Sequence, residues 1–218
     1  MAIRGTIFEI DGTLIDGNDA HAFVEAMAAN GSPDVEFAKV HCLIGMGGDK
    51  LLPETIRGHA GSTLGKKIEA RRAKIFKESF LPHLVPTPGA RNILARLQMD
   101  GVKMVVATSG TPDPTKALLD RVGVLDMLNG IVTGDDVEES KPDPDIVGAA
   151  LQKLGLPAED IHMLGDTPNH VEAARRAGVG PLAVRTGGWS DEGLEGAVRI
   201  FDSPADPLTH YAEIFGRH

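Results

Sequence analysis

The sequence predicts an α/β fold in which helices cover a mostly parallel, doubly wound sheet, with a small helical domain inserted after the first strand. Short apolar runs recur along the chain, and each is followed by a turn and then by residues with helical period. Strands and helices that alternate in this way are typical of a parallel sheet. With 218 residues, 42% of them apolar and 24% charged, the chain has the composition of a globular protein of one or two domains.

Apolar runs that end in turn residues predict the strands. The first run, residues 3–10, ends at Asp11-Gly12, because glycine permits the sharp turn that follows. The second, residues 102–108, ends at Ser109-Gly110. The remaining predicted strands are residues 131–133, 161–164 and 182–184.

Helices are predicted between these strands, and each stops before a glycine that suits a left-handed C-cap. Residues 144–154 show the pattern most clearly, because their apolar residues fall on one face. Asp143 and Pro144 stand there at the N-cap and first-turn positions. The helices and their glycines are 90–100 with Gly101, 115–122 with Gly123, 144–154 with Gly155, and 169–177 with Gly178.

The alternation is interrupted between residues 14 and 88, which contain no convincing strand. Residues 20–29 and 65–80 have helical period and are separated by a glycine-rich loop at 45–48. We therefore predict a core domain of residues 1–15 and 86–218 and an inserted helical domain of residues 16–85. Ligands of open parallel sheets bind beyond the carboxyl ends of the strands, so we expect the insert to close over that edge as a lid.

Charge and composition exclude several classes of protein. The 22 Lys and Arg against 31 Asp and Glu give a net charge of −9, which argues against binding to duplex nucleic acid or an anionic membrane but not against a small anionic substrate. The single cysteine forms no intrachain disulfide, and no apolar stretch suits a signal peptide or a membrane span, so we expect a cytoplasmic protein. No glycine-rich dinucleotide fingerprint follows a strand, which argues against a dehydrogenase.

Polar side chains follow four of the predicted strands. Two carboxylates that stand two residues apart lie on the same side of a strand, and a proline forces the residue before it into an extended conformation. These features predict that carboxylates, hydroxyls and an ammonium group meet at one edge of the sheet. The groups are Glu9 and Asp11 after the first strand, Thr108 and Ser109 after the second, Lys141 before Pro142 after the third, and Asp166 after the fourth.

This set of groups suits phosphoryl transfer. One carboxylate attacks phosphorus in line, its neighbour handles the proton of the leaving oxygen, and a hydroxyl, an ammonium group and Mg²⁺ take the charge of the other oxygens. Each group alone also has a structural explanation, because Asp11 and Asp166 suit turns, residues 108–110 suit the end of a strand and Lys141 suits the surface. Their occurrence together and in this order favours the functional interpretation.

In these positions the chain resembles the haloacid dehalogenase superfamily, in its phosphatase branch. The segment inserted after the first motif resembles the cap of phosphoglycolate phosphatase and β-phosphoglucomutase. The resemblance extends to about residue 200 and implies a Rossmann-like core, an all-α cap domain, dependence on Mg²⁺ and hydrolysis of a small phosphorylated metabolite through an acyl-phosphate. The motifs that carry it are Glu9-Ile10-Asp11-Gly12-Thr13-Leu14, Thr108-Ser109, Lys141-Pro142-Asp143-Pro144 and Gly165-Asp166-Thr167-Pro168-Asn169-His170.

The resemblance also implies a role for each catalytic position. Glu9 stands at the nucleophile and Asp11 at the general acid and base. Thr108 is the phosphate-binding hydroxyl, and Lys141 stabilises the phosphate and the nucleophile. Asp166 binds the metal together with residue 9 and the backbone carbonyl of Asp11.

The chain departs from the family pattern at two positions. The family has aspartate where this chain has Glu9, and usually a second aspartate where it has His170. Glutamate carries its charge one methylene further, and a shift of about 1 Å in a reacting group costs about 100-fold in rate. We therefore expect Glu9 to keep some metal affinity and to be a poor nucleophile.

His170 follows Asp166 by one helical turn, so both side chains can face the same site. Mg²⁺ prefers oxygen ligands, whereas a neutral imidazole suits Zn²⁺ or Ni²⁺. With Glu9, Asp11, Asp166 and His170 as candidate metal ligands, we expect a preference for transition ions or weakened metal binding. The alternative is that His170 points to solvent.

The inserted domain offers Lys50 as a candidate substrate contact, because an acidic protein needs local positive charge to receive a phosphate. The alternative is an exposed lysine at the start of a helix. Ser109 and Gly110 are further candidate substrate contacts.

Three other polar or aromatic groups have structural explanations. His41 and Cys42 are adjacent and so do not face each other in a helix. His162 lies inside a predicted strand, and Trp189 follows Gly187-Gly188 in a loop that could flank the site, where packing explains it better.

Taken together, the sequence predicts a metal-dependent hydrolase of small phosphate monoesters, impaired by Glu9 and His170. The alternative is a catalytically inactive relative that keeps the fold and binds phosphate or metal without turnover.

Overall fold

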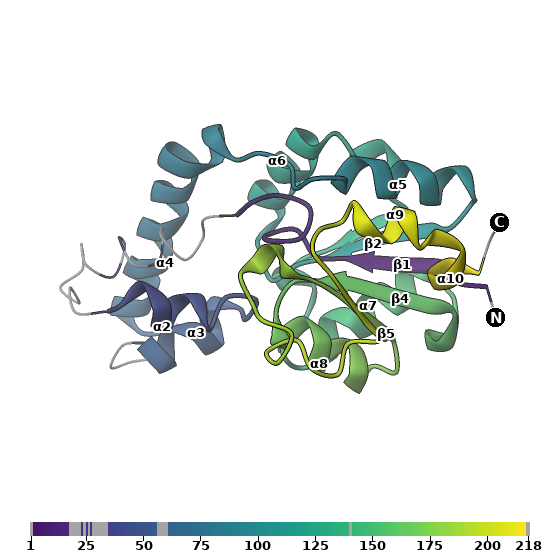
Figure 1. Cartoon of the computed structure of the whole chain (residues 1–218). Helices are drawn as coiled ribbons and strands as arrows, with labels where there is room; N and C mark the ends of the chain where they lie inside the picture. Colours follow the sequence, from purple (N-terminus) through teal and green to yellow (C-terminus); the bar gives the residue numbers. More distant parts are fainter. Residues whose placement is uncertain are drawn as a thin grey trace. The chain divides into compact units, whose positions relative to one another are not determined.

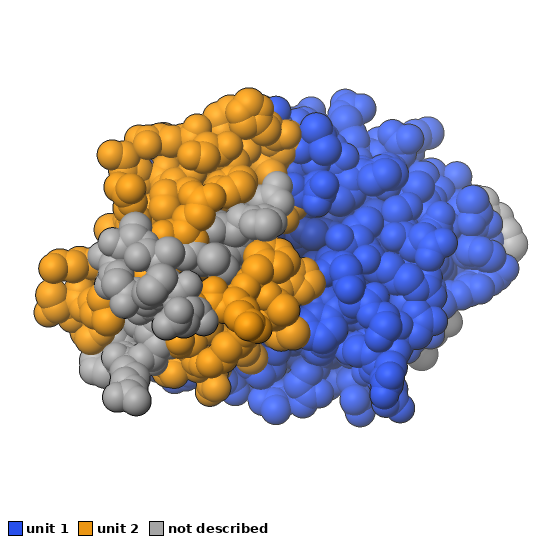
Figure 2. Space-filling model, turned by 60° about the vertical axis from the view of Figure 1, so that its left-hand side comes forward, with its two compact units in different colours: residues 1–16, 85–218 blue, residues 17–84 orange. Residues whose placement is uncertain are grey.

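The computed structural model describes residues 2–17, 23, 25, 27, 35–55, 61–139 and 141–216 (Figure 1). The chain divides into two compact units, one formed by residues 1–16 and 85–218 and the other by residues 17–84 (Figure 2).

The first unit contains a six-stranded sheet in which every pair of neighbouring strands is parallel. The strand order is β3-β2-β1-β4-β5-β6, so β1 lies in the middle, and all four of its residues are buried. The predicted α/β fold with its parallel sheet is therefore confirmed. The strands are β1 (Gly5–Phe8), β2 (Lys103–Ala107), β3 (Gly130–Val132), β4 (Ile161–Gly165), β5 (Gly180–Val184) and β6 (Arg199–Phe201).

Helices cover both faces of this sheet. Figure 1 shows α7 and α8 on one face and α5, α9 and α10 on the other. Ile7 of β1, Val105 of β2 and Met163 of β4 are fully buried in one cluster with apolar residues of α7, which fixes the strands against that helix. The helices are α5 (Ala90–Met99), α6 (Pro112–Val122), α7 (Asp145–Leu154), α8 (Pro168–Arg176), α9 (Asp206–Thr209) and α10 (Tyr211–Phe215).

The glycines predicted to follow the four helices all adopt the left-handed conformation, with φ of 68° at Gly101, 72° at Gly123, 62° at Gly155 and 75° at Gly178. The predicted helix starts differ by a few residues. α6 begins at Pro112 instead of residue 115, because proline suits the first turn of a helix. Pro144 is the N-cap of α7, so the helix itself begins at Asp145.

Short helical turns fill several connections in the first unit. They are η3 (Leu125–Met127), η4 (Gly134–Asp136), η5 (Ala158–Asp160) and η6 (Arg185–Gly187).

The second unit is helical in its described residues and contains no strand there. Ser62 accepts a hydrogen bond from the backbone N–H of Gly65 and so starts α4 two residues before the predicted helix at 65–80. The chain stays helical to Phe80 but changes to π-helical hydrogen bonding at Phe76. The elements are α2 (Phe37–His41), α3 (Gly48–Thr55), α4 (Thr63–Ile75), η1 (Phe76–Phe80) and η2 (Leu81–His83).

Two other predictions concern this unit. Of the helix predicted at 20–29, Phe23, Glu25 and Met27 are helical, and the other positions lie outside the described residues. The predicted loop at 45–48 is shorter than expected, because Gly48 already begins α3. No helix in the part of the chain that the structure describes is long and apolar enough to cross a membrane.

Candidate active site

The candidate site residues follow the carboxyl ends of neighbouring strands. Phe8 at the end of β1 is paired with Val106 of β2 on one side and with Leu164 of β4 on the other. Glu9 continues this register, since its backbone N–H donates to the carbonyl of Leu164 at 3.0 Å. The residues that follow β1, β2 and β4 therefore share one edge of the sheet.

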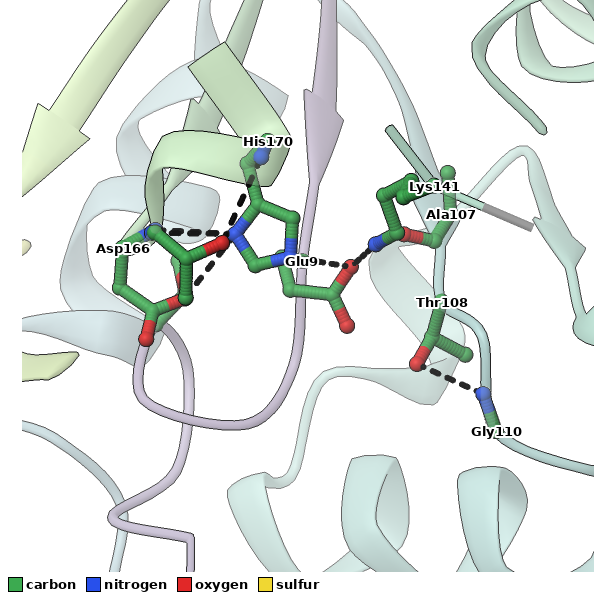
Figure 3. Close-up of polar contacts among 9 residues, drawn as sticks. Glu9, Ala107, Thr108, Gly110, Lys141, Asp166 and His170 are labelled. Atoms are coloured by element: carbon green, nitrogen blue, oxygen red, sulfur yellow. Dashed lines mark hydrogen bonds and ion pairs between the residues drawn. The ribbon is translucent and has the colours of Figure 1, made fainter. Parts of the chain in front are cut away.

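Lys141 and Glu9 form a buried ion pair at this edge (Figure 3). Lys141 Nζ donates to Glu9 Oε2 and also lies 3.4 Å from the carbonyl oxygen of Ala107 in β2. Lys141 is 0% exposed and Glu9 is 4% exposed. Two charges buried to this degree persist only when each neutralises the other, so the pair holds the carboxylate of Glu9 in one place.

His170 lies in the first turn of α8, where it completes a capping box with Thr167. The Thr167 hydroxyl oxygen accepts from the backbone N–H of His170, and Nδ1 of His170 accepts from the backbone N–H groups of Thr167 at 3.3 Å and Asp166 at 3.2 Å. Because two N–H groups point at Nδ1, we assign the proton of the neutral ring to Nε2, which places the lone pair of Nδ1 3.1 Å from Asp166 Oδ1. His170 is 2% exposed, so the alternative that it points to solvent is wrong.

Burial and, to a smaller extent, the charge of Lys141 lower the pKa of His170 to about 3, and the charge of Glu9 opposes them more weakly. The imidazole is therefore neutral over the physiological pH range.

The imidazole ring of His170 lies between two carboxylates (Figure 3). Its Nε2 is 3.4 Å from Glu9 Oε2, and its Nδ1 is 3.1 Å from Asp166 Oδ1. Neither contact is an ion pair, because the ring is neutral. Nε2 has no hydrogen-bond partner among the residues that the structure describes.

Asp166 is enclosed by backbone on its other side. Its Oδ1 accepts a hydrogen bond of 3.1 Å from the hydroxyl of Thr13. A Cβ atom on Gly12 would lie 2.0 Å from Asp166 Oδ2, and one on Gly187 would lie 2.2 Å from the same oxygen. The hydroxyl of Thr186 donates to the carbonyl of Gly12 and joins the two glycine segments. Both glycines are therefore required for the close approach to Asp166.

The loop after β5 thus has the two features that its sequence suggested as alternatives. Gly187 packs against Asp166, and Trp189 packs against a buried cluster of Val171, Ala183 and Leu194. Thr186 was not predicted to lie at the site, because no local sequence pattern indicates that its hydroxyl reaches the distant carbonyl of Gly12.

The hydroxyl groups after β2 lie at the same edge. Thr108 is buried, and its hydroxyl oxygen accepts from the backbone N–H of Gly110 at 3.3 Å. The hydroxyl oxygen of Ser109 is buried and has no hydrogen-bond partner within the described ranges. Asp11 is half-buried in the turn after β1, where it forms a β-bridge with Ile15.

The other candidates lie elsewhere. Lys50 belongs to α3 in the second unit, so its contact with substrate stays a prediction. His162 is in β4, where its Nδ1 lies 3.1 Å from the carbonyl oxygen of Gly180 and burial lowers its pKa, as suits a structural residue. Cys42 is exposed at the end of α2.

The family resemblance implies a divalent cation between residue 9 and Asp166, and the described side chains do not fit one. The ring of His170 stands between the two carboxylates, its Nδ1 lone pair already accepts from two N–H groups, and Glu9 Oε2 accepts from Lys141. Within the described residues, no group of three or more His, Cys, Asp or Glu side chains is arranged to hold a metal ion.

Comparison with known proteins identifies similar chains. The sequence model of the haloacid dehalogenase-like hydrolases matches residues 6–184. Phosphoglycolate phosphatase from Rhodospirillum rubrum is 31% identical over 91% of this chain and 87% of its own. A hydrolase from Pseudomonas syringae has a crystal structure that is similar with a TM-score of 0.90 at 30% identity, covering 97% of this chain and 99% of its own. CbbY from Rhodobacter sphaeroides, solved in complex with phosphate, has a TM-score of 0.77 at 27% identity, covering 94% of this chain and 96% of its own.

Proposed function

Since this chain belongs to the haloacid dehalogenase-like hydrolase family and is similar to its phosphatases, we propose that it hydrolyses small phosphate monoesters, at a rate reduced by Glu9 and His170. The observation that carries the proposal is the buried Lys141–Glu9 pair at the carboxyl edge of the sheet, with the Thr108 hydroxyl beside it (Figure 3). A fixed carboxylate next to an ammonium group and a hydroxyl is suited to attack a phosphoryl group and to bind its oxygens.

In the proposed reaction the phosphoryl group is transferred in two steps. An oxygen of Glu9 forms a bond to phosphorus while the bond from phosphorus to the leaving oxygen breaks, and Asp11 gives that oxygen a proton. Water then attacks the acyl-phosphate, Asp11 takes its proton, and Glu9 is released with inorganic phosphate.

In the same proposal, residues that follow the other strands hold the substrate. Thr108, Ser109 and Gly110 hold the phosphoryl oxygens, and Lys141 balances their charge.

The two departures from the family pattern lower the expected rate. The additional methylene of Glu9 displaces the attacking oxygen by about 1 Å, which costs about 100-fold. Phosphatases of this family generally use Mg²⁺, but the proposal contains no step through a metal ion, because the described residues do not fit one.

A second candidate function is a catalytically inactive relative that binds a phosphorylated ligand without turnover. One observation favours it, namely the ring of His170 between Glu9 and Asp166.

Release of phosphate from an aryl phosphate separates the two candidates. The assay compares the unchanged chain with Glu9→Asp, His170→Asp and the double variant, each with Mg²⁺, Mn²⁺, Co²⁺, Zn²⁺ or EDTA. His83→Asp, the same change at an exposed histidine, is the control. We expect slow turnover by the unchanged chain and a rise of about 100-fold or more in the double variant.

The other outcomes are equally informative. Turnover found only in the Asp variants supports the inactive relative. Equal turnover in all four proteins would show that Glu9 and His170 do not impair the site. A double variant that folds and is inert would contradict hydrolysis of phosphate monoesters.

The second unit is proposed as a cap domain that selects the substrate, with Lys50 as a contact for its phosphate, in a cytoplasmic protein. Lys50→Met is expected to raise KM and to leave kcat nearly unchanged, because Lys50 is not among the groups proposed to react. An equal effect of Lys67→Met, at an exposed residue of α4 in the same unit, would contradict a specific contact of Lys50 with the substrate.

A further inference from the structure

The space between Glu9 and Asp166 is filled by the ring of His170. One ring nitrogen lies 3.4 Å from Glu9 Oε2 and the other 3.1 Å from Asp166 Oδ1, so the imidazole reaches from one carboxylate to the other (Figure 3). A metal ion bound to both carboxylates would have to be within about 2–2.5 Å of an oxygen of each. The ring and such an ion cannot be there together.

The capping box holds the ring in this place. Nδ1 of His170 accepts from the N–H groups of Asp166 and Thr167, and the Thr167 hydroxyl oxygen accepts from the N–H of His170. A rotation of the side chain away from the site would leave the two buried N–H groups of Asp166 and Thr167 without their acceptor, which is unfavourable. The start of α8 therefore opposes the displacement of the ring by an ion.

The same hydrogen bonds determine which nitrogen could bind a metal. A histidine binds a metal through a nitrogen lone pair, and the other nitrogen then carries the proton. Here the lone pair is on Nδ1, where two N–H groups use it, and Nε2 carries the proton that faces Glu9. His170 in this tautomer is not a ligand for Zn²⁺ or Mg²⁺.

The buried charges are balanced without an ion at Glu9. Lys141 is fully buried and donates to Glu9 Oε2, the same oxygen that faces His170. Asp166 Oδ1 accepts from the Thr13 hydroxyl, and its Oδ2 lies against the backbone at Gly12 and Gly187. An ion placed beside Glu9 Oε2 would be close to the ammonium group of Lys141, which repels it.

We propose that this chain takes no divalent cation at its active site, because the imidazole ring of His170 occupies the position between Glu9 and Asp166 that the cation would need. His170 is then a positioning residue whose ring keeps the two carboxylates apart, while Lys141 fixes Glu9. The proposal rests on the proposed function only for the location of the site.

Calorimetric titration of the EDTA-treated chain with Mg²⁺, and then with Zn²⁺, tests the proposal directly. The unchanged chain and the control His83→Asp are expected to show no saturable binding of Mg²⁺ at the site. His170→Asp keeps a hydrogen-bond acceptor for the capping box at the start of α8 and removes the imidazole ring. We therefore expect this variant to bind Mg²⁺ and to gain thermal stability when Mg²⁺ is added. Binding of Mg²⁺ by the unchanged chain at one site, lost in Glu9→Gln, would overturn the proposal.

A second measurement reads the ring itself and does not depend on a variant that folds. ¹⁵N NMR of the histidine side chains in the unchanged chain is expected to show His170 with its proton on Nε2 and an unprotonated Nδ1, in EDTA and in Mg²⁺ or Zn²⁺ alike. A proton on Nδ1, or a shift of Nε2 on addition of Zn²⁺, would contradict the assignment. His162 is the internal reference, because it is half-buried in β4 and its Nδ1 contacts a backbone carbonyl oxygen.

Turnover measured under the same conditions separates this proposal from the proposed function. Hydrolysis of an aryl phosphate by the unchanged chain in EDTA supports both. Hydrolysis by the unchanged chain that requires Mg²⁺ supports the phosphatase function and contradicts the proposal that the site takes no divalent cation. An unchanged chain that binds no cation, together with a folded double variant that is inert, supports the metal-free site and contradicts the phosphatase function.

Discussion

Glu9 presents one carboxylate oxygen to two buried neighbours, the ammonium group of Lys141 and the imidazole of His170. Glu9 and Lys141 are coupled, because a change in either leaves the buried charge of the other without its partner, and His170 contacts the same oxygen without a hydrogen bond. The chemistry at residue 9 therefore depends on side chains that come from three separate parts of the sequence.

Loss of Lys141 should destabilise the protein strongly. Lys141→Met leaves the carboxylate of Glu9 buried without its cation, which costs about 3–5 kcal/mol in the free energy of unfolding. The double variant Lys141→Met and Glu9→Gln should recover much of this loss, since it removes both charges. Urea unfolding of the two single variants and the double variant gives the coupling energy. Lys103 is the control, because its Nζ donates to the carbonyl oxygen of Leu154 at 2.9 Å near the surface. Lys103→Met should lower the free energy of unfolding by about 1 kcal/mol. An equal loss of stability in Lys103→Met and Lys141→Met would contradict a buried ion pair at Lys141.

The neutral His170 should make stability dependent on pH. Burial lowers its pKa from 6.5 to about 3, so below pH 6.5 the unfolded chain takes up a proton that the folded chain does not. The free energy of unfolding should therefore fall as the pH is lowered from 6.5 toward 3, by an amount on the order of a few kcal/mol, and should be independent of this group above pH 6.5. Urea unfolding between pH 4 and pH 8 measures the slope.

His170→Gln is the matched variant, because glutamine also accepts hydrogen bonds at this position of a capping box and does not titrate. It should flatten the slope below pH 6.5, whereas His83→Gln at an exposed site should leave it unchanged. An unchanged slope in His170→Gln would mean that another group, such as His162, causes the pH dependence.

Sequence reasoning at this scale recovered which residues meet but not how they meet. Glu9, Lys141, Asp166 and His170 could be placed together because each follows a strand or begins a helix at one edge of a parallel sheet. The position of the His170 ring could not be predicted, because it depends on two backbone N–H groups that become free only at the start of α8.

The elements that hold the site were predictable where their signals are local. A glycine ends a helix because that residue itself can adopt a positive φ, and a run of apolar residues predicts a buried strand. The short β6, α9 and α10 were not predicted, because distant contacts stabilise them. The guanidinium of Arg96 in α5, for example, lies 4.3 Å from the centre of the Tyr211 ring in α10.

Close packing between η6 and Asp166 should make Gly187 sensitive to substitution. In Gly187→Ala the added methyl group would lie 2.2 Å from Asp166 Oδ2, so the loop must shift, at a cost of about 1–3 kcal/mol in the free energy of unfolding. Gly148→Ala is the control, because a Cβ there has no neighbour within 4 Å and alanine favours the interior of α7. It should raise the free energy of unfolding by about 0.5–1 kcal/mol. Thermal unfolding of both variants checks the prediction, and a Gly187→Ala protein as stable as the unchanged chain would contradict it.

At the scale of the molecule, the second unit leaves the first and returns to it at neighbouring points. The backbone N–H of Asp16 donates to the carbonyl oxygen of Val85 at 2.9 Å, and Thr87 N–H donates to the carbonyl oxygen of Leu14 at 3.1 Å. The ends of the insertion are thus held together by the first unit itself.

Replacement of residues 17–84 by a linker of about four Gly and Ser residues should therefore give a protein that folds, since hairpin loops of 2–5 residues join such ends. Cooperative thermal unfolding and a far-UV circular dichroism spectrum of an α/β protein are the expected results. A protein that does not unfold cooperatively would show that the sheet unit needs the insertion to fold.

The capping box at the start of α8 also bears on how this site could have changed in evolution. Aspartate and histidine can both accept the N–H groups that residue 170 must satisfy, so an exchange between them leaves the start of the helix intact. The codons of aspartate differ by one base from codons of histidine and also from codons of glutamate. Mutation can therefore reach both Glu9 and His170 from a pair of aspartates in single steps. At position 170, that single step preserves the hydrogen bonds that begin α8.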